Sequence, residues 1–325
     1  MFFAQGTSVT EDKIKEIRYN IDKAMIEDSL TDAESDEDSA VNWIDCYSSV
    51  GTISASANKK TVEATAIGTG GEFFLFHPLY LLAGSYYNSD DLMNDKVVID
   101  ENLAWQLYGS SDIIGQTIEI SGVPHIIAGV TKMDNDKMTK AAGVSGAYCF
   151  LSYSSLYNYG TVTGVSFSNV GSSGEEGDLA TSDPGAISCY EVVMPNPVDG
   201  YARSVLAGKI GFKEPDIQTV DNTLRYGFIN LINVLNNFST RSMRTFNVTY
   251  PYWENIARGW EDILSLIMLV RFICIVFVLA ILVWRIVYGY RHKKWTAEGV
   301  WQDIKDRKYD LECKIHDHRE KWKHF

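Results

Sequence analysis

Few side chains in this sequence have the types and spacing of a catalytic set. His77 and His125 are the only histidines before residue 263. Each lies in an apolar run, so we interpret both as packed side chains rather than general bases. Asp134 and Asp136 resemble the start of a calcium loop, but the glycine and the final glutamate of such a loop are missing at the required spacing.

The sequence also offers one weak candidate for a zinc site, in its C-terminal tail. Cys313, His316 and His318 carry suitable ligand atoms. On a helix, however, residues two positions apart point in different directions, which disfavours a shared ion. Neither a nucleophile elbow nor a phosphate-binding Walker A loop is present. We therefore predict that the chain is not an enzyme and has no catalytic residue, cofactor or metal site.

The five cysteines do not form a recognisable disulfide framework. Three of them, Cys46, Cys149 and Cys189, precede the apolar stretch described below, and we interpret them as small buried side chains. One disulfide among these three stays possible. The acidic group at 34–38 is interpreted as a solvated loop, because its spacing matches no calcium loop.

The charge of the chain is divided unevenly. The formal net charge is -13, yet residues 291–325 hold ten basic and seven acidic side chains. The preceding 290 residues therefore hold 19 basic and 35 acidic side chains. The excess of acidic side chains in residues 1–290 argues against binding of this part to nucleic acid and against its docking on anionic lipid.

The stretch that must position everything else is the apolar segment 263–290. A run this long predicts a transmembrane helix. From 272 to 290 a helix would span roughly 28 Å, close to the thickness of the hydrocarbon core. Arg285 can then extend to one interface. Arg271 is either an anchor at the other interface or, if the span starts at Ile263, a buried cation that needs a partner.

The flanks of this segment predict its orientation. A basic cluster at 291–294 follows it directly, whereas 257–262 carries one arginine and two acids. The positive-inside rule then places the C-terminus in the cytoplasm and residues 1–262 outside the bacterial cell membrane. No signal peptide is visible at the N-terminus. Either a first transmembrane helix lies upstream of Met1, which we favour, or the predicted orientation is wrong.

The tail from 291 to 325 has the pattern of a basic amphipathic helix. Trp301, Ile304, Leu311 and Ile315 recur at steps of three and four or their sum, seven. Such a face could rest on anionic lipid headgroups or pack against a partner helix, and the pattern does not choose between them.

The part before the apolar segment reads as α+β. We expect a helix at 10–26, two strands within 40–67 joined by a turn at 57–60, and a strand at 96–100 whose Asp100 caps the next helix. Further expected elements are strands at 117–121, 125–130, 147–153 and 187–194, helices at 198–210 and 222–238, and a helix from about Trp253 through Trp260 into the apolar segment. Asp221 is the expected N-cap of the helix at 222–238.

Several short motifs follow one another in order between residues 73 and 130. FF at 73–74 precedes LLAGSYYNSDD at 81–91, KVVIDENLAWQLYG at 96–109, DIIGQTIEI at 112–120 and HIIAGV at 125–130. This order resembles the periplasmic core domain of MacB-type ABC transporter permeases. The motif residues are Gly84, Glu101, Ala104, Leu107, Tyr108, Gly109, Ile114, Gly115, Gly129 and Val130. Their expected role is structural, in turns and packing.

The resemblance implies a two-lobed extracytoplasmic domain over 1–262. A porter-like α/β lobe would comprise 1–70 and 186–260, with a β-rich lobe at 71–185 inserted in it. The implied function is that of a membrane subunit of an ABC transport complex, whose outer domain couples ATP-driven motion to export or other extracytoplasmic work. The implied partners are an ABC ATPase and a further permease subunit. Because one span follows the domain where the full permease has three, the chain looks like a reduced family member or a fragment.

Two other functions stay open. The chain could be a bitopic sensor whose outer domain captures a ligand and whose tail signals. It could also regulate a cell-wall enzyme, as the related FtsX permeases do.

Overall fold

The structure is a computed structural model of the 325-residue chain. It describes residues 1–3, 9–30, 43–88, 91, 93–132, 136–142, 144, 146–162, 186–209, 217–238, 244–245, 248–292 and 296–323. The acidic group at 34–38, Asp134 of the calcium-like pattern and residues 163–185 lie outside these ranges, as do the side chains of His316 and His318.

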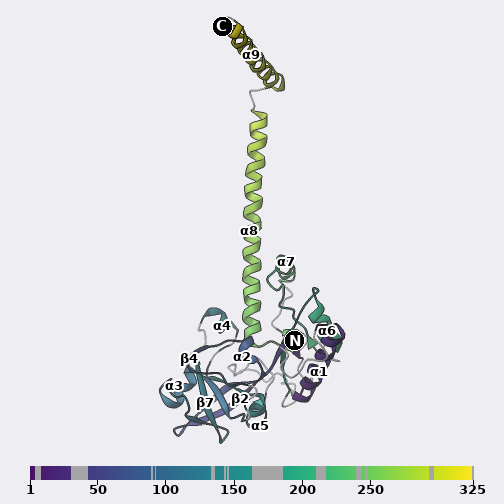
Figure 1. Ribbon diagram of the computed structural model, residues 1–325. Coiled ribbons are helices and arrows are strands. Elements are labelled where there is room, and N and C mark those ends of the chain that lie inside the picture. Colours follow the sequence, from purple (N-terminus) through teal and green to yellow (C-terminus); the bar gives the residue numbers. More distant parts are fainter. Residues whose placement is uncertain are drawn as a thin grey trace. The chain divides into compact units, whose positions relative to one another are not determined.

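The chain divides into two compact units. The first comprises Met1–Ser265 and the second Leu266–Phe325. The first unit mixes helices with one large sheet, as the predicted α+β class requires, and Figure 1 shows its elements with their labels. The helices of the chain are α1 (Glu11–Glu27), α2 (Phe73–Phe76), α3 (Glu101–Tyr108), α4 (Lys137–Ala141), α5 (Tyr153–Tyr159), α6 (Tyr201–Lys209), α7 (Phe228–Asn236), α8 (Tyr252–Arg291) and α9 (Ala297–Lys323).

Within the described residues, the main sheet runs in the order β11-β1-β10-β2-β3-β8-β5-β7-β4, with β6 and β9 beside this path. Most pairs are antiparallel, while β3 with β8 and β5 with β7 are parallel. The strands are β1 (Phe2–Phe3), β2 (Ile44–Ala57), β3 (Lys60–Gly71), β4 (Tyr80–Gly84), β5 (Lys96–Asp100), β6 (Thr117–Ile120), β7 (Val123–Lys132), β8 (Tyr148–Ser152), β9 (Thr161–Val162), β10 (Cys189–Val193) and β11 (Ile217–Gln218). A separate pair is formed by β12 (Arg244–Thr245) and β13 (Val248–Thr249).

Part of this sheet closes on itself as a small barrel. The pairs β2–β3, β3–β8, β8–β5, β5–β7, β7–β6 and β6–β2 return to their starting strand. Closure removes unpaired strand edges. The barrel interior is a core of small and branched side chains, including Ile53, Ala66, Ile99, Ile118 and Leu151.

The long hairpin β2–β3 links the barrel to the rest of the first unit. Its turn places Asn58 and Lys59 at positive φ, as a tight two-residue hairpin turn requires. The far end of the hairpin packs into the barrel core. Near its base, Cys46 and its neighbours on β2 also pair with β10 on their other edge. The predicted hairpin is therefore confirmed, whereas the division into lobes at residues 70 and 186 stays a prediction.

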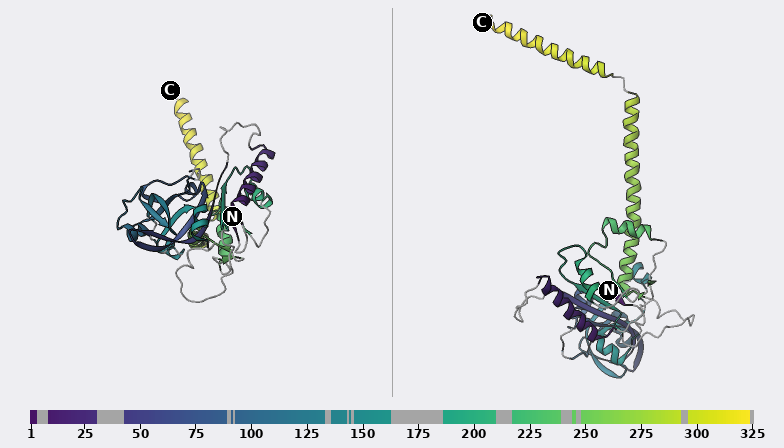
Figure 2. Two further views of the ribbon diagram at one scale, coloured as in Figure 1. Left: turned by 90° about the horizontal axis from the view of Figure 1, so that it is seen from below. Right: turned by 90° about the vertical axis from the view of Figure 1, so that its right-hand side faces the viewer.

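The helix α1 covers the sheet on the side of β10. Its apolar residues Ile14, Ile17, Ile21 and Met25 are buried at spacings of three and four, and they join a second core with residues of β1 and β10. The predicted helix at 10–26 is thus confirmed. Figure 2 shows α1 from two further directions.

The helix α3 begins and ends as the sequence predicts. The carboxylate of Asp100 accepts hydrogen bonds from the backbone N–H groups of Asn102 and Leu103. Gly109 ends the helix in the left-handed conformation, which glycine adopts at little cost. Both predicted signals are confirmed.

The helix expected at 222–238 is shorter than predicted, and Asp221 does not cap it. Residues 222–227 form turns, and α7 begins at Phe228 after Gly227. Asp221 accepts a hydrogen bond from the Thr223 backbone N–H within those turns. The helical spacing of apolar residues continues through this segment, but the side chain of Arg225 is drawn into a buried ion network, described below, that competes with helix formation.

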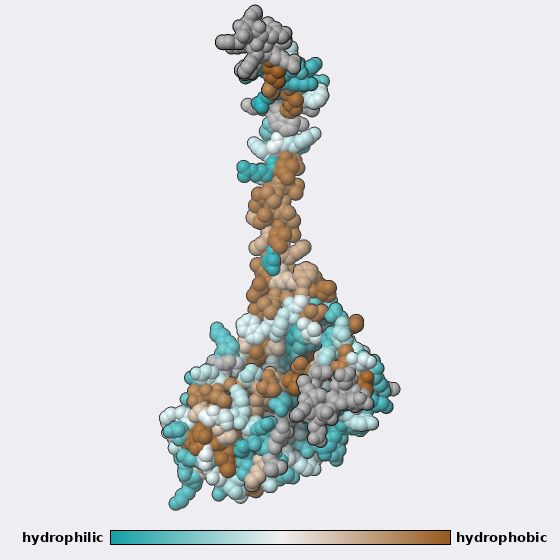
Figure 3. All heavy atoms as spheres, viewed as in Figure 1, coloured by the Kyte–Doolittle hydropathy of each residue, from teal (hydrophilic) through white to brown (hydrophobic). Residues whose placement is uncertain are grey.

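The second unit holds most of helix α8 and all of α9. Helix α8 runs without a break from Tyr252 to Arg291, so the predicted continuation of the helix into the apolar segment is confirmed. Within the described part of the chain, α8 is the one helix that is long and apolar enough to cross a membrane. Figure 3 shows apolar residues gathered along it.

Candidate functional site

The candidate site lies at the base of helix α8, inside the first unit. Glu254, Arg258 and Glu261 occupy positions i, i+4 and i+7 of this helix, so they lie on one face over about 10.5 Å of its length. Tyr252, Ile256 and Gly259 follow the same spacing on another face. The base of α8 therefore has a charged face and an apolar face.

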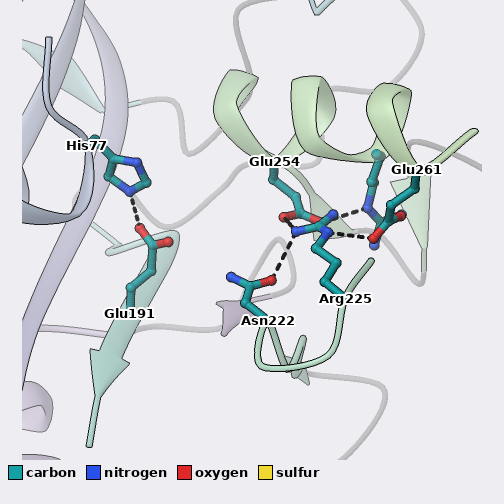
Figure 4. Close-up of polar contacts among 7 residues, drawn as sticks. His77, Glu191, Asn222, Arg225, Glu254 and Glu261 are labelled. Carbon is teal, nitrogen blue, oxygen red and sulfur yellow. Dashed lines mark hydrogen bonds and ion pairs between the residues drawn. The ribbon is translucent and has the colours of Figure 1, made fainter. Parts of the chain in front are cut away.

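Arg225 binds the charged face from the turn segment 222–227. Its guanidinium donates two hydrogen bonds to the Glu254 carboxylate, from Nη1 at 2.6 Å and from Nη2 at 2.8 Å. Its Nε donates to Glu261, which lies about two helical turns further along α8. Asn222 accepts a further hydrogen bond from Nη1 at 3.0 Å. Figure 4 shows these side chains converging, and we call this cluster the Arg225 clamp.

Burial makes the Arg225 clamp energetically important. Arg225, Glu254 and Glu261 are 8%, 4% and 8% exposed. Arg258 completes the clamp, since its Nε donates to Glu254 at 2.9 Å and its guanidinium lies 3.7 Å from the Tyr250 ring centroid. Two arginines thus balance two glutamates. Removing one partner from such a buried group leaves an opposite charge unpaired. This typically lowers the free energy of unfolding by about 3–5 kcal/mol.

The environment also fixes the charge of Arg225. Burial of the guanidinium opposes its charged form, but the hydrogen bonds to Glu254 and the nearby carboxylates outweigh burial and raise the pKa of Arg225 above its ordinary value. Arg225 therefore stays charged at every physiological pH.

The apolar face of the α8 base packs against α2 and α4. The Trp253 ring lies 5.6 Å from the Phe73 ring. Gly259 faces Met138 of α4 so closely that an added Cβ would overlap the Met138 methyl group. The start of α8 is therefore held by the domain on both its faces, before the apolar segment begins.

The two histidines considered in the sequence have different surroundings. His125 is buried, with Nδ1 3.0 Å from the Val123 carbonyl and Nε2 3.3 Å from the Ser155 hydroxyl. His77 is partly buried and pairs with Glu191 at 2.6 Å. Neither lies in the Arg225 clamp.

A comparison with protein families identifies the domain. The model of the "MacB-like periplasmic core domain" matches residues 5–181, more than half of the chain. The chain belongs to the MacB-like periplasmic core domain family. It is accordingly a membrane protein with an extracytoplasmic domain, and the resemblance seen in its sequence motifs is confirmed.

Solved structures with some similarity to this chain include the three that follow. The extracellular domain of the noncanonic ABC-type transporter YknZ from Gram-positive bacteria is 13% identical, with a TM-score of 0.39 over 64% of this chain and 88% of that one. The periplasmic region of MacB from Actinobacillus actinomycetemcomitans is 15% identical, with a TM-score of 0.38 over 64% and 79%. A domain of a putative permease from Porphyromonas gingivalis is 14% identical, with a TM-score of 0.33 over 72% and 90%. No curated protein matches the chain.

The motif residues of the MacB-like domain lie around the barrel rather than at the Arg225 clamp. Ala104, Leu107 and Val130 are in the barrel core. A Cβ on Gly84 would overlap the Ala128 carbonyl, and one on Gly129 would lie 2.6 Å from the Ser85 carbonyl oxygen, so both glycines permit the close approach of the β4 and β7 backbones. The remaining motif residues lie on α3 or in the turn before β6, namely Glu101, Tyr108, Gly109, Ile114 and Gly115.

The membrane and tail residues lie on exposed faces of the second unit. Arg271 and Arg285 are exposed on α8, and neither has an ion-pair partner among the described residues. Trp301, Ile304, Leu311 and Ile315 are exposed on α9, so the predicted apolar face of the tail is uncovered in this chain.

Sequence reasoning missed the Arg225 clamp. One available signal was the spacing of Glu254, Arg258 and Glu261, which puts three charges on one face of a helix about to become fully apolar. No signal identified Arg225 as their partner, because it lies 29 residues before Glu254 in a segment that reads as a helix.

Proposed function

We propose that this chain is a membrane subunit of an ABC-type complex, in which the extracytoplasmic domain moves together with helix α8. The observation that carries this proposal is the Arg225 clamp. It ties the domain to the same helix that continues into the apolar segment. A buried, charge-balanced clamp resists bending at the base of α8, so motion of that helix would be transmitted to the domain rather than lost in a hinge.

Family membership supports the choice of an ATP-driven system. MacB-like periplasmic core domains occur in ABC transporter permeases, and we propose that a cytoplasmic ABC ATPase supplies the motion. A further permease subunit is the second proposed partner. Arg271 and Arg285 are exposed on an apolar helix, and arginines within a membrane usually face protein or reach the interface.

The proposed orientation follows from charge. The basic cluster after α8 favours a cytoplasmic C-terminus, which brings α9 to the side of the proposed ATPase. The exposed apolar residues of α9 could then pack on that partner or rest on anionic lipid.

One observation favours a second candidate function, a ligand-binding sensor. A cleft of about 410 Å³ lies beside the clamp and is lined by Asn196, Asp199, Arg203, Thr223 and Arg225, among others. A small polar ligand in this cleft would contact Arg225 directly and could alter its grip on α8.

The test is purification of the tagged full chain in a gentle detergent, followed by mass spectrometry. We expect an ATP-binding subunit and a further permease in stoichiometric amounts. An unrelated single-span protein with the same tag serves as the control for proteins captured by chance. Recovery without any nucleotide-binding protein would reject the proposal. A cell-wall hydrolase recovered in its place would indicate a regulator of the FtsX type.

A further inference from the structure

A second cluster of polar side chains lies under the base of α8, apart from the clamp. Cys46 of β2, His77 just after α2 and Glu191 of β10 bring their ligand atoms within 4.8 Å of one another. His77 Nε2 is 2.6 Å from Glu191 Oε2, and Cys46 Sγ is 3.9 Å from the same oxygen. Figure 4 shows the side chains of His77 and Glu191 pointing toward each other.

The sheet itself creates this cluster. Cys46 and Glu191 are register partners in the antiparallel pair β2–β10, so their side chains leave the same face of the sheet. Cys189 lies two residues before Glu191 and shares that face. The topology therefore gathers one thiol, one carboxylate and one imidazole in one place.

These donors form a set suited to a metal ion. Sulfur, imidazole nitrogen and carboxylate oxygen are the usual ligands of Zn²⁺. A histidine–glutamate pair alone would not need a fully buried thiol at the shared oxygen, because a thiol is a weak hydrogen-bond donor.

The surroundings allow an ion to enter and hold one ligand in place. The side chains of His77 and Glu191 are 15% and 17% exposed. His77 lines a cleft of about 270 Å³, and Glu191 lines another of about 340 Å³. The rings of Trp253 and Phe73 lie 4.5 Å and 4.9 Å from the His77 ring and restrict its orientation, as supporting residues do around metal ligands.

We propose that Cys46, His77 and Glu191 bind a divalent ion of the Zn²⁺ class, with water as the fourth ligand. Tetrahedral zinc bonds of about 2.0–2.3 Å place neighbouring ligand atoms roughly 3.3–3.5 Å apart. The ion would therefore replace the direct hydrogen bond between His77 and Glu191 and separate these two groups slightly. The Cys46 thiol releases its proton to solvent as the metal–sulfur bond forms.

Such an ion would tie three distant parts of the chain together. His77 and Glu191 are 114 residues apart, and Cys46 and Glu191 are 145 apart. Because the Trp253 ring packs on His77, the ion would also stiffen the seat of helix α8. This inference stands independently of the proposed transport function.

The test uses Co²⁺ as a spectroscopic probe of the site. The full chain is purified in detergent, stripped with a chelator under reducing conditions and titrated with Co²⁺. We expect one equivalent to give the near-ultraviolet thiolate-to-cobalt band and the visible bands of a tetrahedral site, and Zn²⁺ to abolish both. Removal of metal should lower the thermal unfolding midpoint.

Variants assign the ligands. C46S should lose most of the thiolate band, and H77Q and E191Q should each weaken Co²⁺ binding by at least about tenfold. C313S is the matched control, since that cysteine is exposed on α9, and it should retain the full spectrum. Circular dichroism verifies the fold, so H77Q and E191Q still decide if C46S does not fold. The proposal is overturned if no tetrahedral spectrum appears or if C46S, H77Q and E191Q bind like the wild type.

Discussion

Individual charges decide how the base of α8 is held. The Arg225 guanidinium reaches two glutamates that are seven residues apart on this helix, and all three side chains are almost completely buried. Surface ion pairs such as Lys15 with Asp12 have the same chemistry but are exposed to water, which screens them. The difference in burial predicts very different effects of mutation.

We expect Arg225→Met to lower the free energy of unfolding by about 3–5 kcal/mol, because it leaves Glu254 and Glu261 buried with too few counter-charges. Denaturant unfolding of the full chain in detergent, followed by near-ultraviolet circular dichroism, measures this loss. The double variant R225M/E261Q should recover part of it, since Glu254 then keeps Arg258 as its counter-charge. K15M is the exposed control and should leave the midpoint in place. An R225M midpoint equal to that of the wild type would contradict the clamp.

Asp100 provides a pH-dependent test at the start of α3. Burial raises the pKa of this carboxyl from 3.8 to about 6, against the opposing effect of its backbone hydrogen bonds. The folded state thus holds a proton more tightly than the unfolded state. The contribution of the Asp100 proton to the free energy of unfolding is complete below about pH 3.8. It is lost as pH rises through 6, a change of about 3 kcal/mol.

The variant D100N isolates this effect because asparagine also caps helices but does not titrate. Its unfolding free energy relative to the wild type should rise by about 3 kcal/mol between pH 3.5 and pH 6.5. Chemical denaturation of both proteins across this range measures the difference. A difference that stays constant with pH would show that Asp100 ionises normally in the fold.

At the scale of elements, α8 is the connection on which the proposed coupling depends. The helix has no break between Tyr252 and Arg291, and its base is packed on two faces. Rigid helices transmit displacement, whereas a flexible insertion absorbs it.

We expect a Gly-Ser-Gly insertion after Asp262 to uncouple the domain from the apolar segment. ATP-driven movement of the domain, measured by fluorescence from a dye on an exposed barrel residue in the purified complex, should fall several-fold while subunit assembly is unchanged. A seven-alanine insertion at the same position keeps helix phase and stiffness and is the matched control. Equal movement in both insertion variants would exclude transmission through α8.

The elements that local signals specify were predicted well. Helix α1, the β2–β3 hairpin and the caps of α3 depend on residues close in sequence, and all formed as expected. Helix α7 did not, because Arg225 has a stronger interaction 29 residues away than any its own segment offers. Tertiary contacts overrode the helical pattern of residues 222–227.

At the scale of the whole molecule, the proposed orientation in the membrane places Cys313 in the cytoplasm. We expect the native Cys313 to resist a membrane-impermeant maleimide in intact cells and to react once the membrane is permeabilised. Cys46, Cys149 and Cys189 are buried, so they add little signal. Cys274 on α8 is replaced by alanine to remove its contribution.

The matched control places a cysteine on the other side. T61C, at an exposed position near the start of strand β3, should react in intact cells. Labelling of Cys313 in intact cells, with T61C protected, would reverse the proposed orientation.

The sequence by itself determined the class of this protein. An apolar run long enough for a membrane, a basic cluster behind it and an ordered set of motifs between residues 73 and 130 each act over short distances, and they remain readable without any structure. Turn and cap residues such as Asp100 and Gly109 are equally local.

Only the tertiary structure decided which polar groups meet. Barrel closure pairs β2 with β6, the clamp joins Arg225 to Glu254, and the sheet register brings Cys46 beside Glu191. Each contact joins residues that are 29 to 145 apart. Their pairing depends on the packing of the whole domain. For Cys46 and Glu191, for example, one slip in strand register would turn a side chain to the opposite face of the sheet.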